Sequence, residues 1–166
     1  AHYERRRDTE IFKRDNPLQR GECLVAFYCI INDGMGDEKK YGILIVDDDN
    51  FLLDMYAIKF RESGFSVETL GESTRVVAAL KGNPAIDAVL LDIVMPQMDG
   101  FQVLQKIKED KELSRVLVIM LSNLGQEQDI KRATELGADG YIIKANVTPK
   151  DVVEKVKTAL AQKNTG

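Results

Sequence analysis

Residues 43–49 read Ile43-Leu44-Ile45-Val46-Asp47-Asp48-Asp49, four apolar residues followed directly by three acidic ones. An unbroken apolar run rich in β-branched residues is typical of a strand covered on both faces, as in a parallel sheet. Apolar residues at helical spacing follow it, and Gly64 marks the end of the predicted helix; they are Phe51, Leu52, Met55 and Ile58. The stretch therefore predicts a strand–helix unit whose strand ends in carboxylates.

The same alternation continues along the chain. Further strands are predicted at residues 66–70, 88–91, 116–121 and 141–143, each followed by a helical pattern. Asp99 is the expected N-cap of one helix, and Thr148-Pro149-Lys150-Asp151 opens the last. The expected buried stripes of these two helices are Phe101, Leu104 and Ile107, and Val152, Val153, Val156 and Leu160. Five strand–helix units predict an α/β fold, a parallel sheet with helices on both faces.

The first 40 residues do not follow this pattern. They contain one apolar stretch of strand type, Cys23–Ile31, then a turn signal at Asn32-Asp33-Gly34 and a polar, linker-like segment at 35–40. We expect residues 1–40 to be an N-terminal extension and linker, separate from a domain at 41–163. A native extension, an unrelated fusion piece and a start-site artefact all remain open for residues 1–34.

Composition excludes several classes of protein. With 166 residues, 44% hydrophobic and 30% charged, the chain can bury a core. A net charge of −4 argues against non-specific binding to nucleic acid or anionic lipid. The longest apolar run is shorter than the roughly 20 residues that span a bilayer, and no secretory leader is recognised. Two cysteines make no disulfide framework, so we expect a cytoplasmic protein. The single histidine, His2, leaves no zinc site or Ser-His-Asp triad.

Chemically distinctive residues follow four of the five predicted strands. In an open parallel sheet, ligands bind outside the carboxyl ends of the strands. The residues expected at that edge are Asp47, Asp48 and Asp49 after the first strand, Asp92 after the third, Ser122 after the fourth and Lys144 after the fifth.

These residue types suit phosphoryl transfer. Two carboxylates about 4 Å apart repel each other by roughly 4 kcal/mol at an effective dielectric constant of 20, which favours a bound cation. Hard oxygen ligands with open positions suit Mg²⁺. A lysine and a hydroxyl stabilise a transferring phosphoryl group, and a carboxylate nucleophile would give an aspartyl phosphate.

Four motifs, in order, resemble the receiver domain of two-component response regulators over residues 41–163. They are Ile43-Leu44-Ile45-Val46-Asp47-Asp48-Asp49, Leu91-Asp92-Ile93-Val94-Met95-Pro96-Gln97-Met98-Asp99-Gly100, Val118-Ile119-Met120-Leu121-Ser122 and Gly137-Ala138-Asp139-Gly140-Tyr141-Ile142-Ile143-Lys144. The resemblance implies a doubly wound, flavodoxin-like sheet of five strands in the order 2-1-3-4-5.

The resemblance also implies a role for each site residue. Asp92 is the implied phosphoacceptor, and Lys144 pairs with the phosphoryl group. Mg²⁺ is implied to bind Asp47, Asp48, Asp92 and the backbone carbonyl of Val94. Ser122 is the implied switch hydroxyl and Tyr141 the aromatic switch residue. Asp49 matches no role in the family, and we expect it to cap the first helix.

Two features depart from the family pattern or vary within it. Ala145 follows Lys144 where the family usually has proline, which leaves open whether the Lys144–Ala145 bond is cis. Val94 and Leu124, two residues beyond Asp92 and Ser122, are apolar and cannot orient an attacking water.

The leading interpretation is a phosphorylation switch that promotes only its own phosphorylation and dephosphorylation and is not otherwise an enzyme. A sensor histidine kinase or a phosphotransfer protein would be the donor. No output domain is expected after the last helix, so a partner protein on the face of helix 4, strand 5 and helix 5 would receive the signal. The sequence identifies neither that partner nor the kinase.

Two alternatives remain. An aspartate-nucleophile phosphatase of haloacid dehalogenase type would use the Asp-x-Asp pattern in residues 47–49, but would need a second acidic pair where Ser122 and Lys144 stand. A scaffold that works unphosphorylated is the other, and Ala145 keeps it open.

Overall fold

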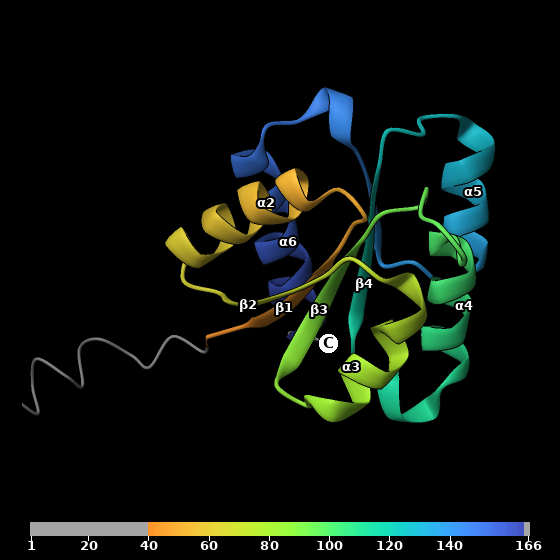
Figure 1. Ribbon diagram of the computed structural model, residues 1–166, viewed down its shortest axis with the longest axis horizontal. Helices are drawn as coiled ribbons and strands as arrows, with labels where there is room; N and C mark the ends of the chain where they lie inside the picture. Colours follow the sequence, from red (N-terminus) through yellow and green to blue (C-terminus); the bar gives the residue numbers. More distant parts are fainter. Residues whose placement is uncertain (1–39, 165–166) are drawn as a thin grey trace, which may run out of the picture. The chain divides into compact units, whose positions relative to one another are not determined.

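The first predicted strand, β1 (Gly42–Val46), lies within a five-stranded sheet whose order is β2-β1-β3-β4-β5 (Figure 1). All four neighbouring pairs are parallel. The computed structural model of the protein describes residues 40–164. The predicted α/β fold, its strand order and its helices on both faces are confirmed. The strand expected at Cys23–Ile31 and the linker at 35–39 lie outside the described residues.

The elements alternate along the chain as expected. The strands after β1 are β2 (Ser66–Leu70), β3 (Ile86–Leu91), β4 (Leu117–Ser122) and β5 (Gly140–Ile143). The helices are α2 (Asn50–Glu62), α3 (Val76–Gly82), α4 (Gly100–Glu109), α5 (Glu127–Glu135) and α6 (Pro149–Asn164). Short 3₁₀ turns stand at η3 (Ser73–Arg75), η4 (Lys111–Leu113) and η5 (Lys144–Asn146). The predicted helix at 73–81 is thus divided into η3 and α3.

The sheet is covered on both faces. Helices α2 and α6 lie on one side of it, and α3, α4 and α5 lie on the other (Figure 1). β1 alternates between the two cores, since Ile43 and Ile45 pack with α2 and α6 whereas Leu44 and Val46 pack with the other three helices. Burial on both faces explains why β1, β3 and β4 are continuous apolar runs. Among residues 40–164, no helix is both long enough and apolar enough to cross a membrane.

Helix α2 is present where its spacing predicted a helix, but it buries other residues. Phe51 is 74% exposed and Ile58 is 57% exposed. The buried side consists of Leu53, Tyr56, Ala57 and Phe60. The chain offers two apolar stripes at helical spacing, and spacing alone did not distinguish the buried one. By contrast, the stripes predicted for α4 and α6 are buried.

Caps fix where the helices begin. Asp49 accepts hydrogen bonds from the backbone N–H groups of Phe51 and Leu52, as an N-cap should. Asp99 and Gln102 form a reciprocal capping box at the start of α4, and Thr148 and Asp151 do the same before α6. These caps set the length of each loop at the carboxyl edge of the sheet.

A glycine holds one of these loops against the sheet. A Cβ atom at Gly100 would collide with the carbonyl oxygen of Asp92, and its backbone N–H donates to the carbonyl of Ile93 at 2.8 Å. The start of α4 therefore closes tightly onto the end of β3. That closure fixes the backbone on which Asp92 is placed.

Candidate functional site

Four strand ends meet at the carboxyl edge of the sheet and bring their polar residues together. Asp47 follows β1, Asp92 follows β3, Ser122 ends β4, and Lys144 follows β5. The backbone N–H of Asp92 donates to the carbonyl of Val46 at 2.9 Å, which ties the ends of β1 and β3. The structure thus brings together residues that the sequence placed at one sheet edge.

Three carboxylates form a cluster at this edge. One oxygen from each of Asp47, Asp48 and Asp92 lies within 4.8 Å of the other two. Asp47 is 3% exposed and Asp92 is 7% exposed, whereas Asp48 is open to solvent. The Asp47 carboxylate is also held in place from its own loop, where it accepts a hydrogen bond from the backbone N–H of Asp49 at 2.9 Å.

Lys144 is the cation that faces the cluster. Its Nζ donates to Oδ2 of Asp47 at 2.6 Å and lies 3.5 Å from Oδ1 of Asp92. Burial lowers the pKa of Lys144, but the hydrogen bond to Asp47 and the charges of Asp92 and Asp47 outweigh it, so the pKa is raised. Lys144 therefore stays charged at neutral pH. One lysine against three carboxylates leaves an excess of negative charge, which a divalent cation would balance.

Asp92 is the carboxylate most affected by its surroundings. Burial raises its pKa, the charge of Asp47 adds to the rise, and Lys144 opposes it. A buried carboxylate with a raised pKa beside a lysine is typical of a functional group.

The hydroxyl of Ser122, at the end of β4, is hydrogen-bonded to the loop that follows the strand. Ser122 is 1% exposed, and its Oγ accepts a hydrogen bond from the backbone N–H of Leu124 at 3.3 Å. The carbonyl of Leu124 accepts a hydrogen bond from the Tyr141 hydroxyl at 2.7 Å. Burial raises the pKa of Tyr141 to about 12, so the phenol keeps its proton and remains a donor. A continuous path of contacts therefore runs from Ser122 to β5.

The peptide bond between Lys144 and Ala145, which the sequence left open, is trans. No peptide bond in residues 40–164 is cis. Lys144 begins the 3₁₀ turn η5 directly after β5. The lysine reaches Asp47 and Asp92 from this turn without a proline beside it.

Sequence reasoning did not single out two aromatic residues near the site. The first is Phe51, in the first turn of α2, which is strongly exposed. Val94, which is not aromatic and stands two residues after Asp92, is strongly exposed as well. Tyr56, on the buried side of α2, is 4% exposed. Its pKa is raised by burial, with Lys144 opposing and Asp47 and Asp92 adding to the rise. Helical spacing alone reveals neither the exposure of Phe51 nor the direction in which Tyr56 points.

A parallel sheet of this order, with acidic, hydroxyl and lysine groups at its carboxyl edge, defines a class of phosphoryl-accepting domain. The chain matches the family described as "Response regulator receiver domain" over residues 43–157. The protein belongs to this family.

Curated relatives agree with the family match. The chain is 36% identical over 118 residues to regulatory protein VanRc of Enterococcus gallinarum, covering 71% of this chain and 49% of that protein. It is 35% identical over 124 residues to DNA-binding response regulator MtrA of Mycobacterium tuberculosis, covering 75% of this chain and 52% of that protein. The chain spans about half the length of the curated relatives it matches.

Solved structures share the fold. A CheY-like response regulator receiver domain protein from Methanospirillum hungatei superimposes with a TM-score of 0.70 at 28% identity, covering 76% of this chain and 98% of that one. The structure of a CheX-CheY-BeF3-Mg²⁺ complex from Borrelia burgdorferi has a TM-score of 0.66 at 35% identity, covering 71% of this chain and 87% of that one.

Proposed function

We propose that the protein is a phosphorylation-dependent signalling switch of a two-component system that accepts a phosphoryl group on Asp92. The observation that carries the proposal is the position of Asp92. Its carboxylate is buried at the end of β3, clustered with Asp47 and Asp48 and 3.5 Å from the lysine. Residues 41–163 act as the switch, and residues 1–40 are an extension outside it.

The carboxylate cluster fits Mg²⁺. Three carboxylate oxygens within 4.8 Å offer hard ligands with room for water and phosphate oxygens, which is the chemistry this ion prefers. Asp47, Asp48, Asp92 and the carbonyl of Val94 would hold it. The relative from Borrelia burgdorferi was solved as a complex that contains Mg²⁺ together with BeF3. When bound, Mg²⁺ would neutralise charge on the phosphoryl oxygens.

The chain's own residues would carry the transfer. A carboxylate oxygen of Asp92 forms a bond to phosphorus while the phosphorus–nitrogen bond of a donor phosphohistidine breaks, and the imidazole nitrogen keeps that electron pair. Lys144 balances charge on the transferring group, and the Ser122 hydroxyl donates a hydrogen bond to one of its oxygens. The protein promotes only this reaction and the loss of its own phosphate.

The path from Ser122 to Tyr141 would carry the signal outward. If Ser122 moves toward a phosphoryl oxygen, its hydrogen bond to the Leu124 N–H changes, and the Tyr141 hydroxyl loses or adjusts its acceptor. The affected surface is formed by α5, β5 and α6, which are the fourth helix, the fifth strand and the fifth helix of the series predicted from the sequence. A downstream protein would bind there. A hollow of about 470 Å³ between β5 and α6 lies on this surface, lined in part by Tyr141, Ile142 and Lys155.

The donor is a protein, a sensor histidine kinase or a phosphotransfer protein. Within residues 40–164, large apolar side chains are strongly exposed at three positions, and two of these, Phe51 and Val94, lie close to the carboxylates in sequence. Apolar groups around a charged centre favour a protein surface over a small phosphate ester, because burying them stabilises a complex. A cytoplasmic location is consistent with such a donor.

The receiver family match does not favour the haloacid dehalogenase alternative. Ser122 and Lys144 occupy the strand ends where such an enzyme would need a second acidic pair. The unphosphorylated scaffold is not favoured either, because the carboxylate cluster and Lys144 are both in place.

The test is phosphorylation by acetyl phosphate and Mg²⁺, measured as intact mass. Wild type should gain one phosphate and Asp92→Asn none. Asp49→Asn is the matched control, because Asp49 also follows a strand but caps α2, and asparagine caps equally well. Labelling of the Asp92→Asn variant would reject the assignment.

Residues 1–34 should be dispensable for this reaction. A chain that begins at Met35 should accept phosphate at the same rate as the full chain and unfold cooperatively near the same temperature. Loss of either property would assign the N-terminal residues a part in the switch.

A further inference from the structure

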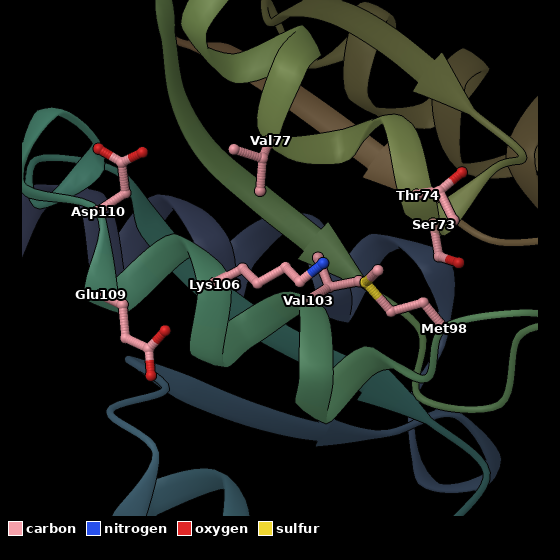
Figure 2. Close-up of a pocket in the computed structure, with 8 residues that line it drawn as sticks. All are labelled: Ser73, Thr74, Val77, Met98, Val103, Lys106, Glu109 and Asp110. Atoms are coloured by element: carbon pink, nitrogen blue, oxygen red, sulfur yellow. The ribbon is translucent and has the colours of Figure 1, made fainter.

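A second hollow, lined by none of the carboxylate-site residues, lies between η3–α3 and α4 (Figure 2). Its volume is about 370 Å³, near the lower end of the range of about 300–1,000 Å³ found for small-molecule sites. We call it the α3–α4 groove. Its lining residues are Ser73, Thr74, Val77, Met98, Val103, Lys106, Glu109 and Asp110.

The charged side chains that line the α3–α4 groove differ in their ion pairs and hydrogen bonds. Asp110 forms an ion pair with Lys81 at 2.8 Å, and Glu109 accepts a hydrogen bond from Gln105 at 2.7 Å. Lys106 has neither an ion pair nor a hydrogen bond with any residue in the described part of the chain. Its side chain extends along α4, with the amino group directed toward the end of the groove that Met98 and Val103 line (Figure 2). The charge at that end of the groove is therefore positive, whereas Glu109 and Asp110 lie at the opposite end (Figure 2).

Apolar side chains stand near this amino group, and two hydroxyl groups lie at the edge of the groove that η3 forms (Figure 2). Ser73 is 4% exposed and donates to the carbonyl of Pro96 at 3.2 Å, which fixes the edge of the groove. The neighbouring Thr74 is exposed, and its hydroxyl is a further donor. Val77, Met98 and Val103 provide the apolar wall. The groove thus combines one positively charged end with an apolar surface.

We propose that the α3–α4 groove binds a small organic acid with a short apolar chain. Its carboxylate would be held by Lys106, and its chain would cover Val77, Met98 and Val103. Glu109 and Asp110 lie at the other end of the groove, so they would not face a carboxylate bound beside the Lys106 amino group (Figure 2). A larger ligand would extend beyond the groove. None of the lining residues belongs to the carboxylate site, so the inference stands whether or not Asp92 is phosphorylated.

The test uses the full chain and 4-methylpentanoate as the probe, without Mg²⁺ or phosphodonor. Binding is followed by the NMR signal of the Met98 methyl group, assigned from Met98→Leu. Saturable binding is expected, with a dissociation constant on the order of 1–10 mM. Acetate keeps the charge without the chain, and 4-methylpentanol keeps the chain without the charge. Each should bind at least about five-fold more weakly, and equal binding of the alcohol would overturn the role of the charge.

Variants separate this site from binding elsewhere. Lys106→Gln should weaken binding of 4-methylpentanoate by about five-fold or more, which is about 1 kcal/mol. Lys131→Gln is the matched control, since Lys131 is an exposed lysine on α5 with a helical partner, Glu135. Both variants should keep the melting temperature of wild type. Equal weakening by both, or none by Lys106→Gln, would overturn the proposal. So would binding at least ten-fold tighter by a peptide with a C-terminal leucine, which would make the groove a peptide site.

Discussion

The carboxylate site and the α3–α4 groove differ in how their polar groups are held. At the site, Asp47, Asp92 and Ser122 are each less than a tenth exposed and are linked to backbone groups or to Lys144. In the groove, Lys106 and Thr74 are exposed and their positions depend on the side chains of two helices. The first region is set by the ends of strands, the second by the packing of helices.

This difference predicts how each region responds to substitution. A buried, mutually bonded group affects its neighbours when it is removed, because desolvated charges lose their partners. An exposed group such as Lys106 can be replaced with little effect on folding. Large effects on phosphorylation should therefore come from the strand ends, and small ones from the groove.

Among variants that keep Asp92, the largest expected effect comes from Asp48→Ala. It removes the solvent-facing carboxylate of the cluster, which we propose as a ligand of Mg²⁺, and phosphorylation by acetyl phosphate with Mg²⁺ should slow by at least about 100-fold. The fold should persist, because Asp48 is exposed and its removal relieves repulsion. Asp49→Ala, one residue later, removes the N-cap of α2 and should lower the free energy of unfolding by about 1 kcal/mol. Its rate of phosphorylation should equal that of wild type. Intact mass measures the rate of phosphorylation, and thermal melting measures the stability. Equal rates in both variants would remove the contrast between metal ligand and cap.

The next effect concerns how long the phosphate persists. Val94 and Leu124 offer no acceptor for a water in line with the bond to phosphorus, so phosphate loss should be slow. Val94→Asn with Leu124→Glu should speed it several-fold, up to about 10-fold. Val94 is 62% exposed, so Val94→Asn alone is the variant that disturbs packing least. Phosphate release from purified phosphoprotein in excess Mg²⁺ is the measurement, and unchanged decay in the double variant would contradict the idea.

A smaller effect separates the two regions by pH. Burial raises the pKa of Asp92 in the folded protein, so the folded state holds that proton more tightly than the unfolded one. Stability should therefore fall as the pH rises from the unfolded carboxyl pKa, about 3.9, through the raised folded value. Asp92→Asn removes this loss of stability. It should raise the melting temperature at pH 7 by a few degrees, which corresponds to a gain of under about 1 kcal/mol in the free energy of unfolding.

The advantage of Asp92→Asn should shrink as the pH falls through that window and vanish below it. Lys106→Gln, in the groove, should show no such dependence. Thermal melting of the variants without metal between pH 3.5 and 7 is the test. A constant difference between Asp92→Asn and wild type across that range would argue against burial as the cause.

The sequence predicted the strand ends well because backbone geometry places them. Alternating apolar strands and helices require a parallel sheet, and parallel strands carry their carboxyl ends to one edge. The sequence alone was therefore sufficient to group Asp47, Asp92, Ser122 and Lys144 at one edge. Caps such as Asp49 and Asp99 were also predictable, because a short polar side chain before a helical pattern has one common use.

Features that depend on side-chain packing were not predictable. Phe51 and Ile58 share their helical spacing with the truly buried stripe, and only the packing of α2 against α6 and the sheet distinguishes them. The α3–α4 groove depends on the division of the helix at 73–81 into η3 and α3, which no local signal marks. The sequence also left open the trans bond at Lys144–Ala145, because alanine stands where proline is usual.

The smallest effect lies in the loop between the two regions. Gln97 lies five residues after Asp92 and directly before Met98, which lines the groove. The residue before it is Pro96, whose carbonyl accepts a hydrogen bond from the Ser73 hydroxyl. Its φ is 67°, the one positive φ at a non-glycine residue in the described ranges. An L-residue there costs about 1 kcal/mol, and glycine removes most of that at some cost in chain entropy.

Gln97→Gly should therefore stabilise the protein by about 0.5–1 kcal/mol, measured by urea unfolding. Gln97→Ala is the control, because alanine keeps the Cβ atom that makes this conformation unfavourable, and it should be close to wild type. Since both variants keep the loop length, the rate of phosphorylation and the affinity of the α3–α4 groove for 4-methylpentanoate should stay within about two-fold of wild type. A Gln97→Gly variant no more stable than Gln97→Ala would show that this backbone conformation carries no strain. A large change in either function would show instead that the loop couples the strand ends to the groove, so the two regions could no longer be treated as independent.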